Sequence, residues 1–155
     1  MSTASALPRR CRGVLSLDDF DTLARCHLPR PLFAYVSGAV EDNHSRADNR
    51  RAFADLAFRP RVLAGVAERD LGFELFGRRY SAPVGLAPMG ISALTAYRGD
   101  IVLAQAAQQA GVPAIMSGSS LIRLEDVMAQ APHTWFQAYL PGDMAQIDGL
   151  LDRVV

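Results

Sequence analysis

The second half of the chain alternates short apolar segments with helical segments, and this alternation limits the fold more than any other feature. The apolar segments lie at 84–87, 114–116 and 134–139, and each leads into small or polar residues and then into a helical pattern. Short buried strands that alternate with helices form parallel sheets through right-handed βαβ units. The sequence therefore predicts an α/β fold with about three βα units over 83–155.

The helices between these segments have recognisable ends. Gly99 and Asp100 open a helix that we expect to run through Ala110, because Gly111 and Pro113 stop it. A second helix is expected at about 124–131, and a last one begins at Asp143.

The part of the chain before this alternation predicts a helical cap over 16–60. Ser16 is a plausible N-cap for a first helix, with Asp18 and Asp19 placed favourably in its first turn. Two further helices are expected at about 31–36 and 43–56. The preceding residues, 1–15, are expected to form a flexible N-terminus.

The segment 61–82 connects the cap to the alternating region and has strand character. We expect a strand at 61–65 and a hairpin at 73–80 that folds back at Gly77.

Composition excludes several function classes. The chain has 155 residues, with 16 Lys+Arg against 16 Asp+Glu, whereas general nucleic-acid binders carry a basic excess. All of the basic residues are arginine, so Schiff-base lysine chemistry and the P-loop lysine are excluded. Cys11 and Cys26 lack the spacing and neighbouring ligands of a zinc site, so no metal is expected.

Nothing in the sequence predicts a membrane or secreted protein. The N-terminal arginines are not followed by the apolar segment of a signal peptide, and no stretch approaches the roughly 20 apolar residues of a membrane span. We therefore expect a cytoplasmic location.

Candidate ligand-binding residues follow the three expected strands. Ligands of parallel α/β folds lie beyond the carboxyl ends of the strands. Small residues there let the backbone approach a flat ligand, and hydroxyl or amide groups can satisfy its heteroatoms. Gln137 and Tyr139 are two apart on an expected strand and should face one side. The candidates are Pro88, Met89 and Gly90, then Ser117, and finally Gln137 and Tyr139.

Purely structural roles compete with these assignments. A loop serine often caps a turn, and a strand tyrosine or the helical Tyr35 often serves packing. A buried glutamine is harder to explain by packing, because its amide requires partners. The three histidines, His27, His44 and His133, lie at no expected strand end and receive no catalytic role.

Several short segments, taken in their order along the chain, form a recognisable pattern. The segments are Leu28-Pro29, Phe33-Ala34-Tyr35-Val36-Ser37-Gly38-Ala39, Glu41-Asp42, Asn49-Arg50, Ala52-Phe53, Phe58-Arg59-Pro60-Arg61, Ala82-Pro83-Val84-Gly85-Leu86-Ala87-Pro88, Asp100, Ala110-Gly111, Ser117 and Trp135-Phe136-Gln137-Ala138-Tyr139. Their order and spacing resemble the FMN-dependent 2-hydroxy-acid dehydrogenases and oxidases, which include glycolate oxidase, mandelate dehydrogenase and the flavin L-lactate dehydrogenase. The resemblance covers 16–155 and implies the N-terminal part of a (β/α)₈ TIM barrel.

The resemblance implies roles for matching positions. Tyr35 would bind the substrate carboxylate. Tyr139 would contact the substrate through its hydroxyl, help to polarise the reacting centre and belong to the FMN-binding residues as well. Pro88-Met89-Gly90 would lie against the flavin ring of FMN, with Met89 in place of the threonine of glycolate oxidase. Ser117 and Gln137 would bind FMN through their side chains.

The implied reaction oxidises a small L-2-hydroxy acid to a 2-oxo acid with FMN as cofactor. The family's histidine base, its two arginines and its lysine would come after Val155, so no catalytic residue is assigned and the chain alone is expected to be inactive. The family implies a homo-oligomer, and a partner chain could supply the rest of the barrel. An FMN-dependent isopentenyl diphosphate isomerase fits less well, because of Tyr35 and 137–139. A non-catalytic half-barrel that binds flavin weakly or pairs with a partner chain stays open.

Overall fold

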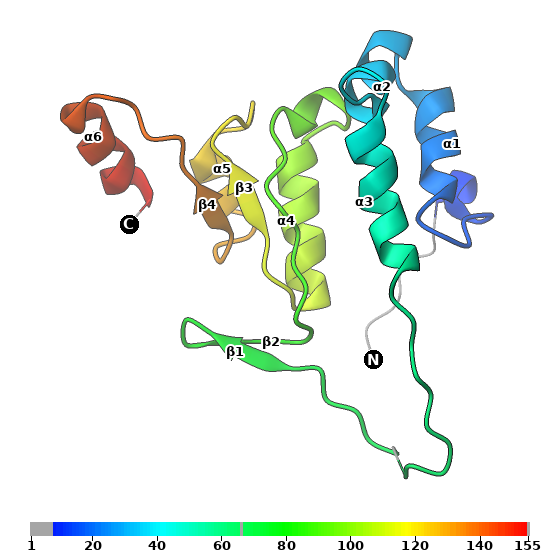
Figure 1. The fold of residues 1–155 in the computed structure, drawn as a ribbon. Helices are drawn as coiled ribbons and strands as arrows, with labels where there is room; N and C mark the ends of the chain where they lie inside the picture. Colours follow the sequence, from blue (N-terminus) through cyan, green and yellow to red (C-terminus); the bar gives the residue numbers. More distant parts are fainter. Residues whose placement is uncertain (1–7, 66, 155) are drawn as a thin grey trace. The chain divides into compact units, whose positions relative to one another are not determined.

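The computed structural model describes residues 8–65 and 67–154 (Figure 1). These residues separate into two compact units, with the boundary between Leu63 and Ala64. The unit boundary lies three residues beyond the predicted end of the cap at residue 60. Residues 1–7 of the expected flexible N-terminus lie outside the described residues, and a short 3₁₀ turn, η1, forms at Arg9–Cys11.

The first unit consists of helices and confirms the predicted helical pattern. Pro29 precedes α2 and Pro31 lies in its first turn, where a missing N–H costs nothing. None of the three helices buries a residue completely, so the described residues of this unit form no buried hydrophobic core. The helices are α1 (Asp19–His27), α2 (Arg30–Ser37) and α3 (His44–Ala54).

The predicted N-cap at Ser16 is wrong. Helix α1 begins at Asp19, and the carboxylate of Asp19 accepts hydrogen bonds from the backbone N–H groups of Leu15 and Ser16, each at 2.8 Å. These two bonds lower the pKa of Asp19 because they stabilise its charged form. The aspartate therefore organises the entry to the helix from inside its first turn.

The second unit opens with the predicted hairpin. Strands β1 (Phe73–Leu75) and β2 (Arg78–Tyr80) pair antiparallel, with Phe73 opposite Tyr80. Phe76 and Gly77 connect them with φ values of 50° and 72°, as a type I′ turn requires. The predicted strand at 61–65 is wrong, since this segment forms no strand and positive φ values at Leu63 and Gly65 break the extended conformation.

Parallel pairing follows the hairpin. Strands β3 (Ile115–Ser117) and β4 (Trp135–Gln137) pair in parallel and lie side by side in Figure 1. The predicted strand at 84–87 is reduced to one parallel bridge between Leu86 and Ala114. Leu86 N–H donates to the carbonyl oxygen of Pro113 at 2.9 Å, and Ile115 N–H donates to that of Leu86 at 3.0 Å. Prolines at positions 83, 88 and 113 lack the N–H needed to extend this ladder.

The α-helices of the second unit lie at the predicted positions, though α5 ends before the predicted Ala131. The short 3₁₀ turn η2 was not predicted. Gly111, with φ 69°, ends α4 in the left-handed conformation that favours glycine. Arg153 on α6 donates to the carboxylate of Glu125 on α5 at 2.9 Å. The helices are η2 (Ser92–Leu94), α4 (Gly99–Ala110), α5 (Leu124–Met128) and α6 (Met144–Val154).

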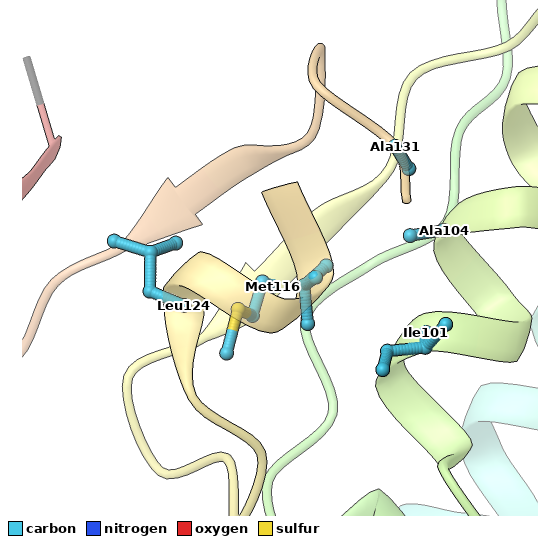
Figure 2. Close-up of a cluster of buried hydrophobic side chains, with 6 residues drawn as sticks. Ile101, Ala104, Met116, Leu124 and Ala131 are labelled. Atoms are coloured by element: carbon cyan, nitrogen blue, oxygen red, sulfur yellow. The ribbon is translucent and has the colours of Figure 1, made fainter. Parts of the chain in front are cut away.

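The core lies where α4 and α5 meet β3. Val127 is fully buried, and Phe136 on β4 packs against the buried cluster. Figure 2 shows Ile101, Met116 and Leu124 of this cluster. Because strand side chains alternate, the residues on either side of Phe136, Trp135 and Gln137, face away from this core. The buried cluster consists of Ile101, Ala104, Met116, Leu124, Val127 and Ala131.

Replacing Ser92 by alanine is expected to raise the free energy of unfolding of this unit by about 1 kcal/mol. The Ser92 side chain is 5% exposed, and its Oγ has no hydrogen-bond partner among the described residues, so its removal relieves an uncompensated burial. Urea unfolding followed by circular dichroism measures the change. Ser81→Ala is the comparison, because the Ser81 Oγ donates to the carbonyl oxygen of Ala110 at 2.6 Å, and its loss should lower stability. A destabilised S92A would show that the hydroxyl has a partner.

Candidate functional site

The site is built on the carboxyl ends of β3 and β4. The two strands are in register, so Ser117, the last residue of β3, lies opposite Gln137, the last residue of β4. Ser117 Oγ donates a hydrogen bond to Gln137 Oε1 at 3.2 Å, and the backbone N–H of Gly118 donates to the same oxygen at 3.4 Å. The structure thus brings together the two side chains that the sequence singled out separately.

The hydrogen bond from Gly118 fixes the orientation of the Gln137 amide. A backbone N–H can only donate, so the amide atom that faces it must be the oxygen. The planar amide then turns Nε2 away from Gly118. Among the described residues, no hydrogen bond is recorded from Nε2. Gln137 is half-buried, and its two N–H donors are therefore free to meet acceptor atoms of a ligand.

Gly118 is the tightest position of the site. A Cβ atom at this residue would lie 2.7 Å from the carbonyl oxygen of Gln137 and 3.1 Å from Cδ2 of the Tyr139 ring. Only glycine allows this approach between the two strand ends. The same contact places the Tyr139 ring beside the β3 end, with the side chain 66% exposed.

The segment Pro88-Met89-Gly90 joins the same region of the second unit. Ile91 N–H donates to the carbonyl oxygen of Ser119 at 3.2 Å, which ties the end of this segment to the loop after β3. A Cβ at Gly90 would lie 3.3 Å from Cβ of Ser119 and 3.9 Å from Oγ of Ser117. Met89 is 49% exposed, so the segment presents side chain and backbone to the surroundings.

The positions of Tyr139 and Tyr35 differ from what the sequence predicted or left open. The expectation that Gln137 and Tyr139 share one strand is wrong, because β4 ends at Gln137 and the argument from strand alternation does not reach Tyr139. Tyr35 lies on α2 in the first unit and is 71% exposed, which does not fit a core residue of that unit.

Sequence reasoning missed a further group of residues around Ser117. Ser119 N–H donates to Ser117 Oγ at 3.1 Å, and Ser120 Oγ donates to the carboxylate of Asp100 at 2.7 Å. The three serines at 117, 119 and 120 were a visible signal, but nothing in the sequence paired them with Asp100.

The described residues contain no group of three or more histidine, cysteine or acidic side chains that could hold a metal ion. None of their helices is long and apolar enough to cross a membrane. The cytoplasmic location stays a prediction.

A parallel sheet whose strand ends carry an oriented amide, a serine and closely approached glycines is typical of α/β proteins that bind a ligand beyond the carboxyl ends of their strands. A profile of the FMN-dependent dehydrogenase family matches residues 24–155. The chain belongs to this family, and FMN is the family's cofactor.

Individual relatives agree with this assignment. The chain is 38% identical over 141 residues to an L-lactate dehydrogenase of Xanthobacter autotrophicus, covering 90% of this chain and 36% of the relative. It is 40% identical over 141 residues to an L-lactate dehydrogenase of Caulobacter vibrioides, covering 90% and 37%. With the (S)-mandelate dehydrogenase of Pseudomonas putida the identity is 32% over 130 residues, covering 83% and 33%.

Solved structures give the same result for the fold. An oxidised active mutant of (S)-mandelate dehydrogenase superimposes with a TM-score of 0.84 at 31% identity, over 91% of this chain and 40% of that chain. A mandelate oxidase gives a TM-score of 0.83 at 31% identity, over 90% and 40%. The chain spans about a third of the length of the curated relatives that it matches.

Proposed function

We propose that this chain forms the flavin-binding part of an enzyme that oxidises an L-2-hydroxy acid to a 2-oxo acid with FMN. The observation that carries the proposal is the Ser117–Gln137 pair. Both recognised hydrogen bonds of the Gln137 amide go to Oε1, so the N–H donors of Nε2 point away from Gly118 and are available to a ligand. The relatives' names, L-lactate dehydrogenase and (S)-mandelate dehydrogenase, support a small 2-hydroxy acid as substrate.

The residues present fit FMN. The edge of a flavin ring carries carbonyl oxygens and ring nitrogens, which accept hydrogen bonds from an amide such as Gln137 Nε2. Glycines at positions 90 and 118 carry no side chain that would keep a flat ring away from the backbone. At Gly118 the missing Cβ also lets the end of β3 approach the carbonyl oxygen of Gln137 closely. Bound FMN would supply a two-electron acceptor for the oxidation.

Each site residue has a proposed part. Gln137 binds and orients the flavin ring through Nε2. Ser117 binds FMN beside it and holds the Gln137 amide in that orientation. The backbone of 88–90 lies against the ring. The hydroxyl of Tyr139 contacts the substrate, and the hydroxyl of Tyr35 binds the substrate carboxylate. None of these parts includes the removal of a proton from the substrate.

Among the described residues of the second unit, no histidine lies at the carboxyl ends of β3 and β4. His133 precedes β4, at the opposite end of this strand from Gln137, and the chain has no lysine. We therefore expect the 155-residue chain alone to bind FMN without turning over lactate, glycolate or mandelate. Measurable turnover of any of these by the purified chain would contradict that expectation.

The larger architecture is part of the same proposal. The bridge at Leu86 and strands β3 and β4, with α4, α5 and α6, correspond to the first three βα units of a TIM barrel. Residues 16–60 serve as its helical cap. The complete enzyme is proposed to be a homo-oligomer, or to receive the remaining strands from a partner chain.

Removing the Gln137 side chain amide is expected to weaken FMN binding about tenfold, since a lost hydrogen bond to a buried ligand group costs about 1–2 kcal/mol. Quenching of FMN fluorescence during titration with the wild-type chain and with Gln137→Ala gives the two dissociation constants. Gln109→Ala, at an exposed position of α4, is the matched control and should bind like wild type. Equal affinity of Q137A and wild type would remove Gln137 from the site.

The non-catalytic alternative predicts a different outcome. A half-barrel without a flavin site would show no quenching by the wild-type chain at any concentration, and the Gln137 substitution would have nothing to change. Absence of FMN binding by the wild-type chain would therefore favour this alternative over the proposed function.

A further inference from the structure

Asp100 is a buried carboxylate to which the proposed function gives no part. It lies in the first turn of α4, and the residue is 6% exposed. Asp100 forms no ion pair with the other described residues. The ion pairs that the described residues do form all join exposed side chains. A buried carboxylate without a cation is costly unless hydrogen bonds compensate it, so its partner is informative.

That partner is the loop after β3. Ser120 Oγ donates to Asp100 Oδ2 at 2.7 Å, and the same Oγ accepts the backbone N–H of Ile122 at 2.9 Å. The hydroxyl proton of Ser120 is thus committed to the carboxylate, which leaves its lone pairs for the Ile122 N–H. A hydrogen bond to a charged acceptor is about twice as strong as one between neutral groups.

The loop continues directly to the flavin site. Ser120 N–H donates to the carbonyl oxygen of Ser117 at 3.0 Å, and Ser119 N–H donates to Ser117 Oγ at 3.1 Å. Ser117 Oγ in turn donates to Gln137 Oε1. A continuous series of hydrogen bonds therefore runs from Asp100 on α4 to the amide of Gln137 on β4.

We propose that Asp100, acting through the hydroxyl of Ser120, is a positioning residue that holds loop 117–122 in the conformation that presents Ser117, Gly118 and Gln137 to FMN. The inference rests on the proposed function for the identity of the ligand. The hydrogen bond between Asp100 and Ser120 acts on the loop and not on the ligand, so its effect on the order of the loop can be measured with or without FMN.

The position of Asp100 in the first turn of α4 explains how a buried carboxylate is tolerated as the anchor of this loop. The first turn of a helix has unpaired N–H groups and the positive end of the helix dipole, which stabilise a nearby negative charge. The charge is therefore held in place by α4, the helix that also supplies Ile101 and Ala104 to the core. A rigid element thus anchors a loop that has no regular secondary structure.

Amide hydrogen exchange of the full 155-residue chain, measured by NMR with and without FMN, tests the proposal on four variants. In Asp100→Ala and Ser120→Ala, exchange at the Ile122 and Ser119 amides should accelerate about tenfold, while the amide of Val127 in the core changes little. Asp100→Asn retains an acceptor oxygen and should lie between wild type and D100A. Asp126→Asn changes an exposed carboxylate in the first turn of α5 and should leave the loop unchanged.

FMN affinity provides the second measurement. D100A and S120A should each weaken binding about fivefold, and the double variant should be no weaker than either single variant, because both remove the same contact. Unchanged exchange of the loop amides in D100A would overturn the proposal. Acceleration of the Val127 amide by the same factor as the loop would also overturn it, since that pattern indicates a general loss of stability.

Failure of the proposed function would appear differently. If the wild-type chain bound no FMN while D100A still released the loop, the flavin assignment would be wrong and the positioning of the loop by Asp100 would stand.

Discussion

Gly118→Ala is expected to abolish measurable FMN binding. The new Cβ would lie 2.7 Å from the carbonyl oxygen of Gln137, a backbone atom that cannot move without displacing the end of β4. Relieving that contact separates the ends of β3 and β4 and breaks the hydrogen bonds from Ser117 and Gly118 to Gln137 Oε1. Overpacking of this kind costs about 1–3 kcal/mol, and the loss of ligand contacts adds to it. We expect the dissociation constant for FMN to rise at least about a hundredfold.

Fluorescence titration with FMN measures this effect, and circular dichroism establishes that the variant is folded. Gly142→Ala is the matched control, because a Cβ at Gly142 meets nothing within 4 Å. The control should bind FMN like the wild-type chain. A folded G118A variant with wild-type affinity would show that FMN does not bind at the ends of β3 and β4.

Val127→Ala is expected to lower the free energy of unfolding of the second unit by about 2–3 kcal/mol. Val127 is the one described residue with a fully buried large side chain, and it lies in the cluster formed by α4, α5 and β3. The substitution removes about two buried methylene equivalents, each worth about 0.8 kcal/mol, and leaves a cavity that adds to the loss.

Urea denaturation of the two variants gives the difference directly. Val102→Ala, at a position of α4 that is 52% exposed, is the control and should change stability by less than about 0.5 kcal/mol. A V127A variant as stable as the control would mean that the cluster in Figure 2 does not hold this unit together.

The helices were the most predictable part of the fold, for a local reason. The bounds of α4, Gly99–Ala110, agree with the prediction because Gly111 can adopt the left-handed conformation that ends a helix. The start of α1 was less predictable, since the choice between Ser16 and Asp19 depends on which oxygen reaches the free N–H groups. The prediction of a strand at 61–65 was wrong because a strand also needs a partner segment to pair with, and the apolar residues of this segment do not supply one.

In the candidate site, too, local features were predictable and contacts between different elements were not. The residue types at the strand ends, Ser117 and Gln137, were predicted because ligands of parallel sheets lie beyond those ends. Their direct hydrogen bond follows from the register of β3 with β4, which depends on pairing between segments 20 residues apart. The contact between Asp100 and Ser120 could not be predicted, because it joins a helix to a loop through packing around a shared core.

The sequence by itself determined the alternation of strands and helices, the hairpin turn at Gly77 and the family to which the chain belongs. These features depend on backbone conformations and apolar spacing that neighbouring residues fix between themselves. Only the tertiary structure decided which way the Gln137 amide turns, why position 118 must be glycine and which loop the buried Asp100 holds. Those properties depend on distances of about 3 Å between atoms of different elements, and only packing brings such atoms together.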